Sequence, residues 1–111
     1  MFKEAIRGLR LAIVHNNKLI LFAAVGAVLM QIAKTINFSP TGMYATYICI
    51  MIVFSAEMLN DVVELICNKI TKETDEDIKN IKDISAGVVL VLSVMAAFLY
   101  MMILGIELYD I

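Results

Sequence analysis

The feature that most constrains this chain is a series of three apolar segments separated by short polar ones. They cover residues 19–33, 43–56 and 84–106. A helix needs about 20 mostly apolar residues to cross the hydrocarbon of a bilayer. The third segment is long enough by itself, and the first is if it extends to Ile36 with Lys34 reaching the interface. The second is long enough only if its helix continues through the polar residues that follow.

The composition places the chain among membrane proteins rather than soluble domains. Hydrophobic residues make up 61% of its 111 residues, whereas an ordinary soluble domain has about half. One proline, five glycines and the lack of any low-complexity tract argue against a disordered chain. The net charge of −2 gives no reason to expect nucleic acid as a partner. We therefore expect a single all-α membrane domain over residues 1–111.

The residues before the first apolar segment have the pattern of an amphipathic helix on a membrane surface. Over residues 1–17, apolar side chains recur on one side and basic side chains on the other, with the 3.6-residue period of a helix. We expect this surface helix to precede transmembrane helices at 18–36, 43–69 and 84–107. A tight turn at 37–42, NFSPTG, joins the first two spans.

The basic residues predict the orientation of the spans. Lys and Arg gather before the first span and between the second and third, whereas the hairpin side carries only Lys34. Cytoplasmic segments carry such an excess, so we expect the N-terminus and the polar loop at 71–82 in the cytoplasm and the C-terminus outside. Asp75 and Asp77 in this loop are expected to start a short helix that leads into the third span.

The stretch AEMLNDVVELICNK, residues 56–69, places an acidic stripe where the second span should end. Its polar side chains are spaced i, i+3, i+4, i+7 and i+11, and on a helix they share one face: Glu57, Asn60, Asp61, Glu64 and Asn68. Ionisable groups at membrane depth are costly and generally face a protein interior with a partner. If the second and third spans are antiparallel neighbours, Lys82 and Asp83 face the same end of this helix.

This combination of side chains suits a divalent cation and phosphate. Mg²⁺ takes carboxylate oxygens together with substrate phosphates, a lysine neutralises charge in phosphoryl transfer, and a further carboxylate can deprotonate a hydroxyl. The glycines are scattered singly, so no phosphate-binding loop indicates a nucleotide. The pattern alone predicts an acidic site at the membrane, with phosphate chemistry as one of its uses.

The motif AEMLNDVVEL, followed by a loop and KDISAGVVLVL, resembles the small prokaryotic diacylglycerol kinases, a family that includes the undecaprenol kinases of Gram-positive bacteria. The family pattern is Glu-x-x-Asn-x-x-x-Glu in the second span and Lys-Asp at the start of the third, here Glu57, Asn60, Glu64, Lys82 and Asp83. The resemblance covers essentially the whole chain, including the surface-helix residues RGLRLA. It implies a homotrimer in the bacterial cytoplasmic (inner) membrane, with shared active sites that face the cytoplasm.

The resemblance also implies an activity: ATP-dependent phosphorylation of a membrane lipid alcohol, with Mg²⁺ as cofactor. By position, Glu57 would be the general base that takes the proton from the lipid hydroxyl, and Asn60 would orient the site. Glu64 would hold Mg²⁺ with the ATP phosphates. The residues GLRLA favour diacylglycerol as the substrate, whereas AEMLN and SAGVVL favour undecaprenol.

Three further residues receive roles from the resemblance. Lys82 would contact phosphate, with Asp83 positioning it, and Glu73 of the loop would lie near the nucleotide. Independently of the resemblance, Arg10 on the basic face of the surface helix is expected to meet anionic lipid headgroups, with nucleotide phosphate as the less favoured partner.

One position departs from the family pattern. The family has a second metal-binding Glu where the surface helix leads into the first span, and an ungapped alignment on RGLRLA puts Asn16 there. Asn16 could offer a carbonyl oxygen to Mg²⁺ and ATP, but it removes a negative charge. Asp61 is a candidate replacement, since it is extra relative to the usual small residue and shares a face with Glu57 and Glu64.

Three alternatives to an ordinary lipid kinase remain. The first is a weakened or repurposed member of the family. The second is a proton- or cation-coupled carrier, although carriers usually show paired repeats and this chain shows none. The third is a structural subunit whose acids only cap a helix, which leaves the paired acidic and Lys-Asp motifs unexplained.

Overall fold

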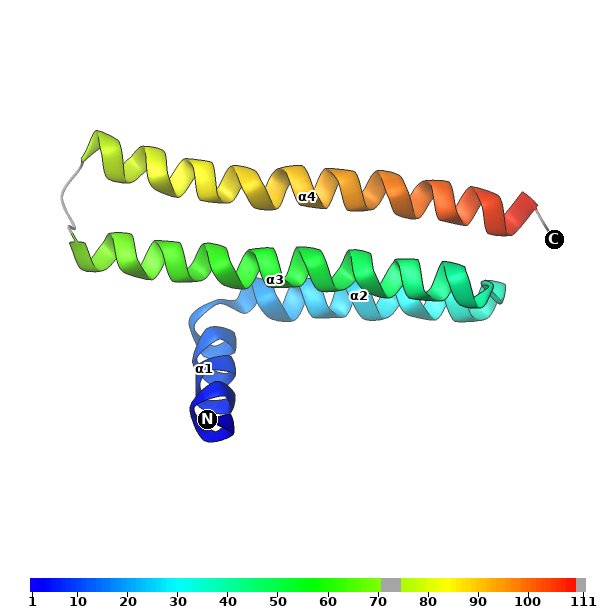
Figure 1. Ribbon diagram of the computed structural model, residues 1–111, viewed down its shortest axis with the longest axis horizontal. Coiled ribbons are helices and arrows are strands. Elements are labelled where there is room, and N and C mark those ends of the chain that lie inside the picture. The colour runs from blue at the N-terminus through cyan, green and yellow to red at the C-terminus, as the bar shows by residue number, and fades with distance from the viewer. Residues whose placement is uncertain (71–74, 110–111) are drawn as a thin grey trace.

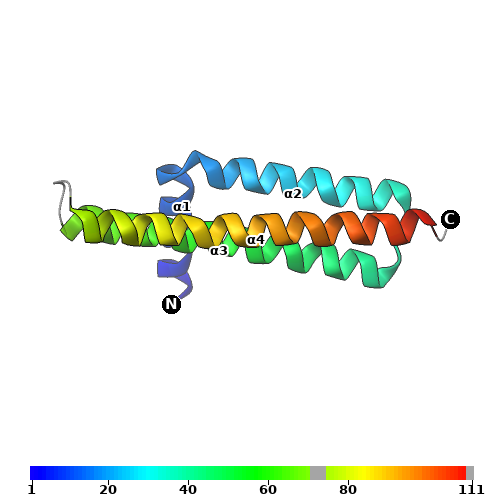
Figure 2. The ribbon, with the colours of Figure 1, turned by 90° about the horizontal axis from the view of Figure 1, so that it is seen from above.

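The computed structural model describes residues 1–70 and 75–109, and within them all regular structure is helical. The helices are α1 (Phe2–His15), α2 (Asn17–Ile36), α3 (Pro40–Ile70) and α4 (Glu76–Tyr109). The last three run side by side as a long bundle, with α4 on one side of the α2–α3 hairpin (Figure 1, Figure 2). α3 packs along both α2 and α4, whereas α2 and α4 touch each other little. The all-α class expected from the sequence is confirmed.

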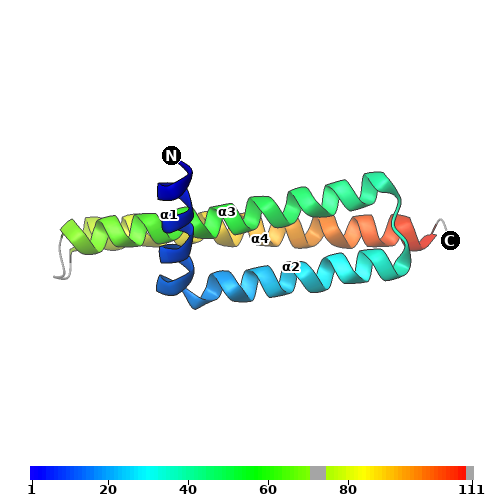
Figure 3. The same ribbon diagram turned by 90° about the horizontal axis from the view of Figure 1, so that it is seen from below.

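α1 is set crosswise to the bundle at the end of α2 that lies away from the hairpin (Figure 3). None of its side chains is buried, and the apolar Phe2 and Ile6 are 82% and 59% exposed. The break between α1 and α2 is Asn16, whose backbone is extended with φ −135° and ψ 103°. An amphipathic helix whose apolar face meets no protein is suited to lie in a membrane interface, as the sequence predicts.

The connection between α2 and α3 is a compact turn. Asn37 adopts the left-handed conformation, with φ 71° and ψ 53°, and the backbone N–H of Phe38 donates to the Ala33 carbonyl at 3.0 Å. This arrangement closes the C-termini of many helices. Proline is favoured at a first helical position, and α3 accordingly begins at Pro40. The expected turn at 37–42 is therefore shorter in the structure, because Gly42 already lies in the helix.

A carboxylate from the far end of the chain holds this turn. Glu107 Oε2 accepts from the Ser39 backbone N–H at 3.1 Å, and Glu107 Oε1 accepts from Ser39 Oγ at 2.6 Å. Ser39 Oγ in turn accepts from the Gly42 backbone N–H at 3.2 Å. Gly42 lies so close that a Cβ there would collide with Glu107 Oε1. The last turns of α4 are thus bound to the first turn of α3.

The main apolar cluster lies at the same end of the bundle and joins all three long helices. It is formed by Ala33, Phe38, Tyr100 and Ile103, with Met43 and Ala45 of α3 packed against them. The Tyr100 hydroxyl donates to the backbone carbonyl of Leu29 at 2.9 Å, a direct hydrogen bond from α4 to α2. Further along α2, Gly26 lies against Ile50 of α3, and a Cβ on Gly26 would be 2.8 Å from Ile50 Cγ2. The hairpin end is therefore the tightly packed end.

The other end of the bundle differs in helix length. α2 rises about 30 Å, which matches the roughly 30 Å thickness of membrane hydrocarbon, whereas α3 and α4 rise about 46 and 51 Å. α3 and α4 therefore continue past the level of Asn16 (Figure 1, Figure 3). We call this part, residues 62–70 and 76–83, the overhang. α4 starts earlier than the expected 84 because Asp75 Oδ1 accepts from the Ile78 N–H at 3.1 Å and caps the helix, so the expected short helix and third span are one helix.

The lengths and compositions of α2 and α4 would allow them to cross a membrane. Among the described helices, α3 is not one of those that length and composition pick out as a candidate span. α3 nevertheless runs without a break from the turn through the whole acidic stripe. That continuity is the condition under which the second apolar segment could serve as a span.

Candidate active site

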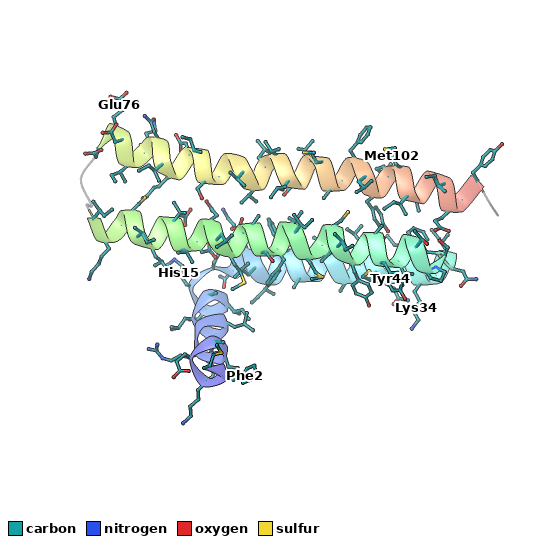
Figure 4. All side chains as sticks on the ribbon, viewed as in Figure 1. Phe2, His15, Lys34, Tyr44, Glu76 and Met102 are labelled. Atoms are coloured by element: carbon teal, nitrogen blue, oxygen red, sulfur yellow. The ribbon has the colours of Figure 1, made fainter. Side chains whose placement is uncertain are left out.

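The acidic stripe of α3 faces the junction between α1 and the N-terminal end of α2. His15 marks this junction in Figure 4. Three members of the stripe are buried despite their polarity, with Glu57 5%, Asn60 8% and Asp61 4% exposed. Glu57 lies about 25 Å along α3 from Pro40, close to the length of α2. The stripe thus begins near the level of the N-terminal end of α2.

Asn16 joins the helix junction to the stripe. Its side-chain Nδ2 donates to Glu57 Oε1 at 3.0 Å and to Asp61 Oδ1 at 2.6 Å. Its Oδ1 accepts from the Lys18 backbone N–H at 2.9 Å and caps the N-terminus of α2. The reversed amide would point a carbonyl oxygen at two carboxylates, so the cap and the acids select the same orientation.

This orientation bears on the two roles expected at the departing position. The Asn16 carbonyl oxygen, expected to be available to Mg²⁺, already accepts a backbone hydrogen bond, and the amide hydrogens face the acids. Asp61, the candidate replacement carboxylate, lies within hydrogen-bond distance of position 16. The structure therefore brings together Asn16, Glu57 and Asp61.

Two oxygen atoms in this group lack partners. Asn60 Oδ1 and Asp61 Oδ2 are buried without a hydrogen bond. Over residues 1–70 and 75–109 the one ion pair joins the Met1 ammonium to Glu4, so no described cation neutralises Glu57 or Asp61. Uncompensated buried carboxylates cost several kcal/mol each. Unpaired buried oxygens are the atoms for which a bound cation or donor would supply the missing contact.

Glu64 lies one turn beyond Asp61 and is half-buried. Within the described part of the chain, no three Asp, Glu, His or Cys side chains gather closely enough to hold a metal ion by themselves. A metal here would need ligands from elsewhere. Mg²⁺ in phosphate-handling sites commonly has one or two carboxylates and takes its other ligands from phosphates and water.

The structure brings Lys82 to the far end of the stripe. Its Nζ donates to Asn68 Oδ1 at 2.6 Å, from α4 to α3 within the overhang. Lys82 forms no ion pair with a described carboxylate. The neighbouring Asp83 is exposed, and Arg10 is exposed on α1. Glu73 lies outside the described residues.

Sequence reasoning placed Asn68 on the acidic stripe but gave it no role. The available signal was its position one turn after Glu64, on the face that a lysine from an antiparallel α4 would reach. The contact of Glu107 with Ser39 was not expected at all. The sequence feature that could have indicated this contact is Glu107, a carboxylate directly after the last apolar segment.

Comparison with known proteins identifies the family. The profile of the family described as prokaryotic diacylglycerol kinase matches residues 3–104, which include the helix junction, the acidic stripe and the Lys82-Asp83 pair. Among curated proteins, none matches this sequence significantly. The match covers most of the chain and confirms the resemblance seen in the motifs. The chain belongs to the prokaryotic diacylglycerol kinase family of integral-membrane lipid kinases.

Proposed function

We propose that the chain transfers the γ-phosphoryl group of ATP to the hydroxyl of diacylglycerol, giving phosphatidic acid. Membership of a lipid kinase family supports the reaction type. The observation that carries the assignment is the buried Glu57 carboxylate, which Asn16 holds near the N-terminal end of α2. Lipid hydroxyls lie at that level, between hydrocarbon and water.

Glu57 is assigned as the general base. Asn16 donates to its Oε1, and Oε2 has no hydrogen-bond partner among the described residues. The lipid hydroxyl gives its proton to Glu57 while its oxygen bonds to the γ-phosphorus of ATP. The bond from that phosphorus to the β–γ bridging oxygen breaks, and ADP leaves with the electron pair.

The donors present fit Mg²⁺, the cation that kinases of this family use with ATP. The unpaired Asp61 Oδ2 and Asn60 Oδ1 are hard oxygen donors of the kind Mg²⁺ prefers. Asp61 and Glu64 would hold the ion together with ATP phosphates, and Asn60 would orient the set. Bound there, Mg²⁺ would neutralise charge that builds up on the phosphates. We assign the amide hydrogens of Asn16 to the two carboxylates. We do not assign Asn16 as a metal ligand, because its carbonyl oxygen caps α2.

Lys82 and Asp83 are assigned to the nucleotide side of the site. The Lys82 ammonium is held by the neutral Asn68 near the end of the stripe and has no carboxylate partner among the described residues. A lysine so placed can contact the transferred phosphate, with Asp83 positioning it. Arg10, exposed on α1, is assigned to lipid headgroups.

The test is transfer of labelled phosphate from ATP to diacylglycerol and, separately, to undecaprenol in detergent micelles. We expect diacylglycerol to be phosphorylated and E57Q to lose at least about a hundredfold in rate, the usual contribution of a general base. E76Q removes an exposed carboxylate at the start of α4 and serves as the matched control. Equal activity in E57Q would refute the assigned base, and transfer to undecaprenol alone would change the acceptor.

A magnesium titration tests the metal ligands separately. D61N and E64Q should each raise the Mg²⁺ concentration needed for half-maximal rate, because each removes one anionic ligand. An unchanged titration curve in D61N, with unchanged turnover, would remove Asp61 from the metal site and leave a weakened kinase as the better description.

We further propose a homotrimer in the bacterial cytoplasmic membrane, with active sites shared between subunits and facing the cytoplasm. Large apolar side chains are exposed along α2, α3 and α4, which suits contact with lipid and with other copies. Native mass spectrometry from detergent should give three times the 12.3 kDa chain mass, and a monomer that retains full activity would refute the shared site.

A further inference from the structure

Asn16 makes more hydrogen bonds than the capping of α2 requires. Aspartate, serine and threonine cap helix N-termini about as well as asparagine. Each would accept the Lys18 N–H, the one contact that the cap needs. The chain also uses both hydrogens of the Asn16 amide, one toward Glu57 and one toward Asp61. Of the good capping residues, only asparagine has an acceptor together with two donor hydrogens.

The negative charges around position 16 also favour an asparagine there. Glu57 and Asp61 are both more than nine-tenths buried and have no cationic partner among the described residues. An aspartate at position 16 would keep the cap but set a third carboxylate against them. An apolar residue would leave both acids without the donor. The amide at position 16 therefore supplies a hydrogen bond to the carboxylate at position 61 without adding a further negative charge.

We propose that Asn16 is a positioning residue for Glu57, and that Asn16 and Asp61 form an interdependent pair. The Asn16 amide fixes the two carboxylates side by side, so that Glu57 presents Oε2 while Oε1 is held. Asn16 contacts neither substrate in this arrangement and acts through the base. The assignment of Glu57 as the base rests on the proposed function, whereas the interdependence of the pair rests on the hydrogen bonds alone.

The experiment is a double-mutant cycle on the full chain in detergent micelles, with N16D, D61N and the N16D/D61N combination. Each variant is measured for kcat, for KM of ATP and of diacylglycerol, and for its thermal unfolding midpoint. N17D makes the same chemical change one residue further along, at an exposed position, and is the matched control.

We expect N16D to lower kcat by about tenfold to a hundredfold, the cost of losing a hydrogen bond to a buried charge. Both KM values should stay within about threefold, because Asn16 is proposed to act on the base and not on substrate binding. The rate is expressed per folded protein, so that a loss of folded enzyme alone does not lower kcat. The unfolding midpoint should fall by at least about 4 °C. With kcat measured at saturating Mg²⁺, which offsets the loss of Asp61 as a metal ligand, adding D61N should recover most of kcat and of the midpoint, and N17D should change neither.

The proposal is overturned if the effects of N16D and D61N simply add, or if N16D matches or exceeds the parent in activity. If N16D does not fold, a double variant that folds supports the pair, and one that also fails refutes it. A chain without any kinase activity would sink the proposed function, yet the unfolding midpoints would still decide the pair. An active kinase with additive midpoints would leave the function standing and remove the pair.

Discussion

Replacing Gly42 with alanine should break the contact between the start of α3 and the end of α4, two segments that are far apart in the sequence. A Cβ at position 42 would collide with Glu107 Oε1 and lie 3.1 Å from Glu107 Cδ. The Glu107 side chain is flexible enough to move, so the collision itself can be relieved. Moving it, however, removes the hydrogen bonds that Glu107 accepts from the Ser39 N–H and Oγ.

The size of the effect follows from those two bonds. A hydrogen bond to a charged group contributes about 1.5–3 kcal/mol when buried, but Ser39 is exposed and solvent reduces this value. We expect G42A to lower the free energy of unfolding by about 1–2 kcal/mol. In an E107A background nothing remains to collide with, and alanine should stabilise α3 by up to about 1 kcal/mol over glycine. The sign of the substitution should therefore reverse.

The assay is reversible unfolding in detergent micelles by sodium dodecyl sulfate, followed by the loss of helical circular dichroism. G42A, E107A and the double variant complete the cycle. E107Q is the steric control, because its side chain keeps its size and G42A should still destabilise there. If G42A has the same effect in the parent and in E107A, Glu107 is not the neighbour that makes glycine necessary.

Three other substitutions test contacts along the bundle. Y100F removes the hydroxyl bonded to a backbone carbonyl of α2 and should cost about 0.6 kcal/mol in the same unfolding assay, the average for hydrogen bonds between membrane helices; a cost above about 2 kcal/mol would mean that packing is also lost. G26A places a Cβ against Ile50 and should cost about 1–3 kcal/mol through overpacking, a cost that I50A should relieve. N68D gives Lys82 a carboxylate partner in place of an amide and should raise the KM for ATP about tenfold, with kcat nearly unchanged; an unchanged or lower KM would mean that Lys82 does not meet phosphate.

Local features of the fold followed directly from sequence patterns. Apolar runs of sufficient length predict helices, Ser-Pro before Gly42 predicts the turn, and the spacing of the acids predicts a shared face on α3. Such features depend on residues within a few turns of each other. Asp75 and Asp77 were expected to start a short helix ahead of the third span, and the structure joins the two in one continuous helix that Asp75 caps.

Contacts between distant parts of the chain could not be predicted in the same way. The position of Asn16 at the site came from the family resemblance, but the direction of its amide depends on three partners, two of them on another helix. The Glu107 contact with Ser39 spans 68 residues. Nothing in the local pattern near either residue specifies the other. These contacts form because α3 packs against both α2 and α4. The periodicity of a single sequence does not specify how helices pack together.

The unequal length of the helices has a consequence for how two unlike substrates meet. α2 begins just after Asn16 while α3 and α4 continue past that level, so the acidic stripe lies beside the start of α2 and runs on into the overhang. Under the proposed function, a lipid can bring its alcohol to Glu57 without lifting its tails out of the hydrocarbon. ATP reaches Lys82 and Asn68 while remaining in water. On that proposal the phosphate crosses a boundary between two solvents, and the acceptor would be selected by the size and depth of its headgroup more than by its tail.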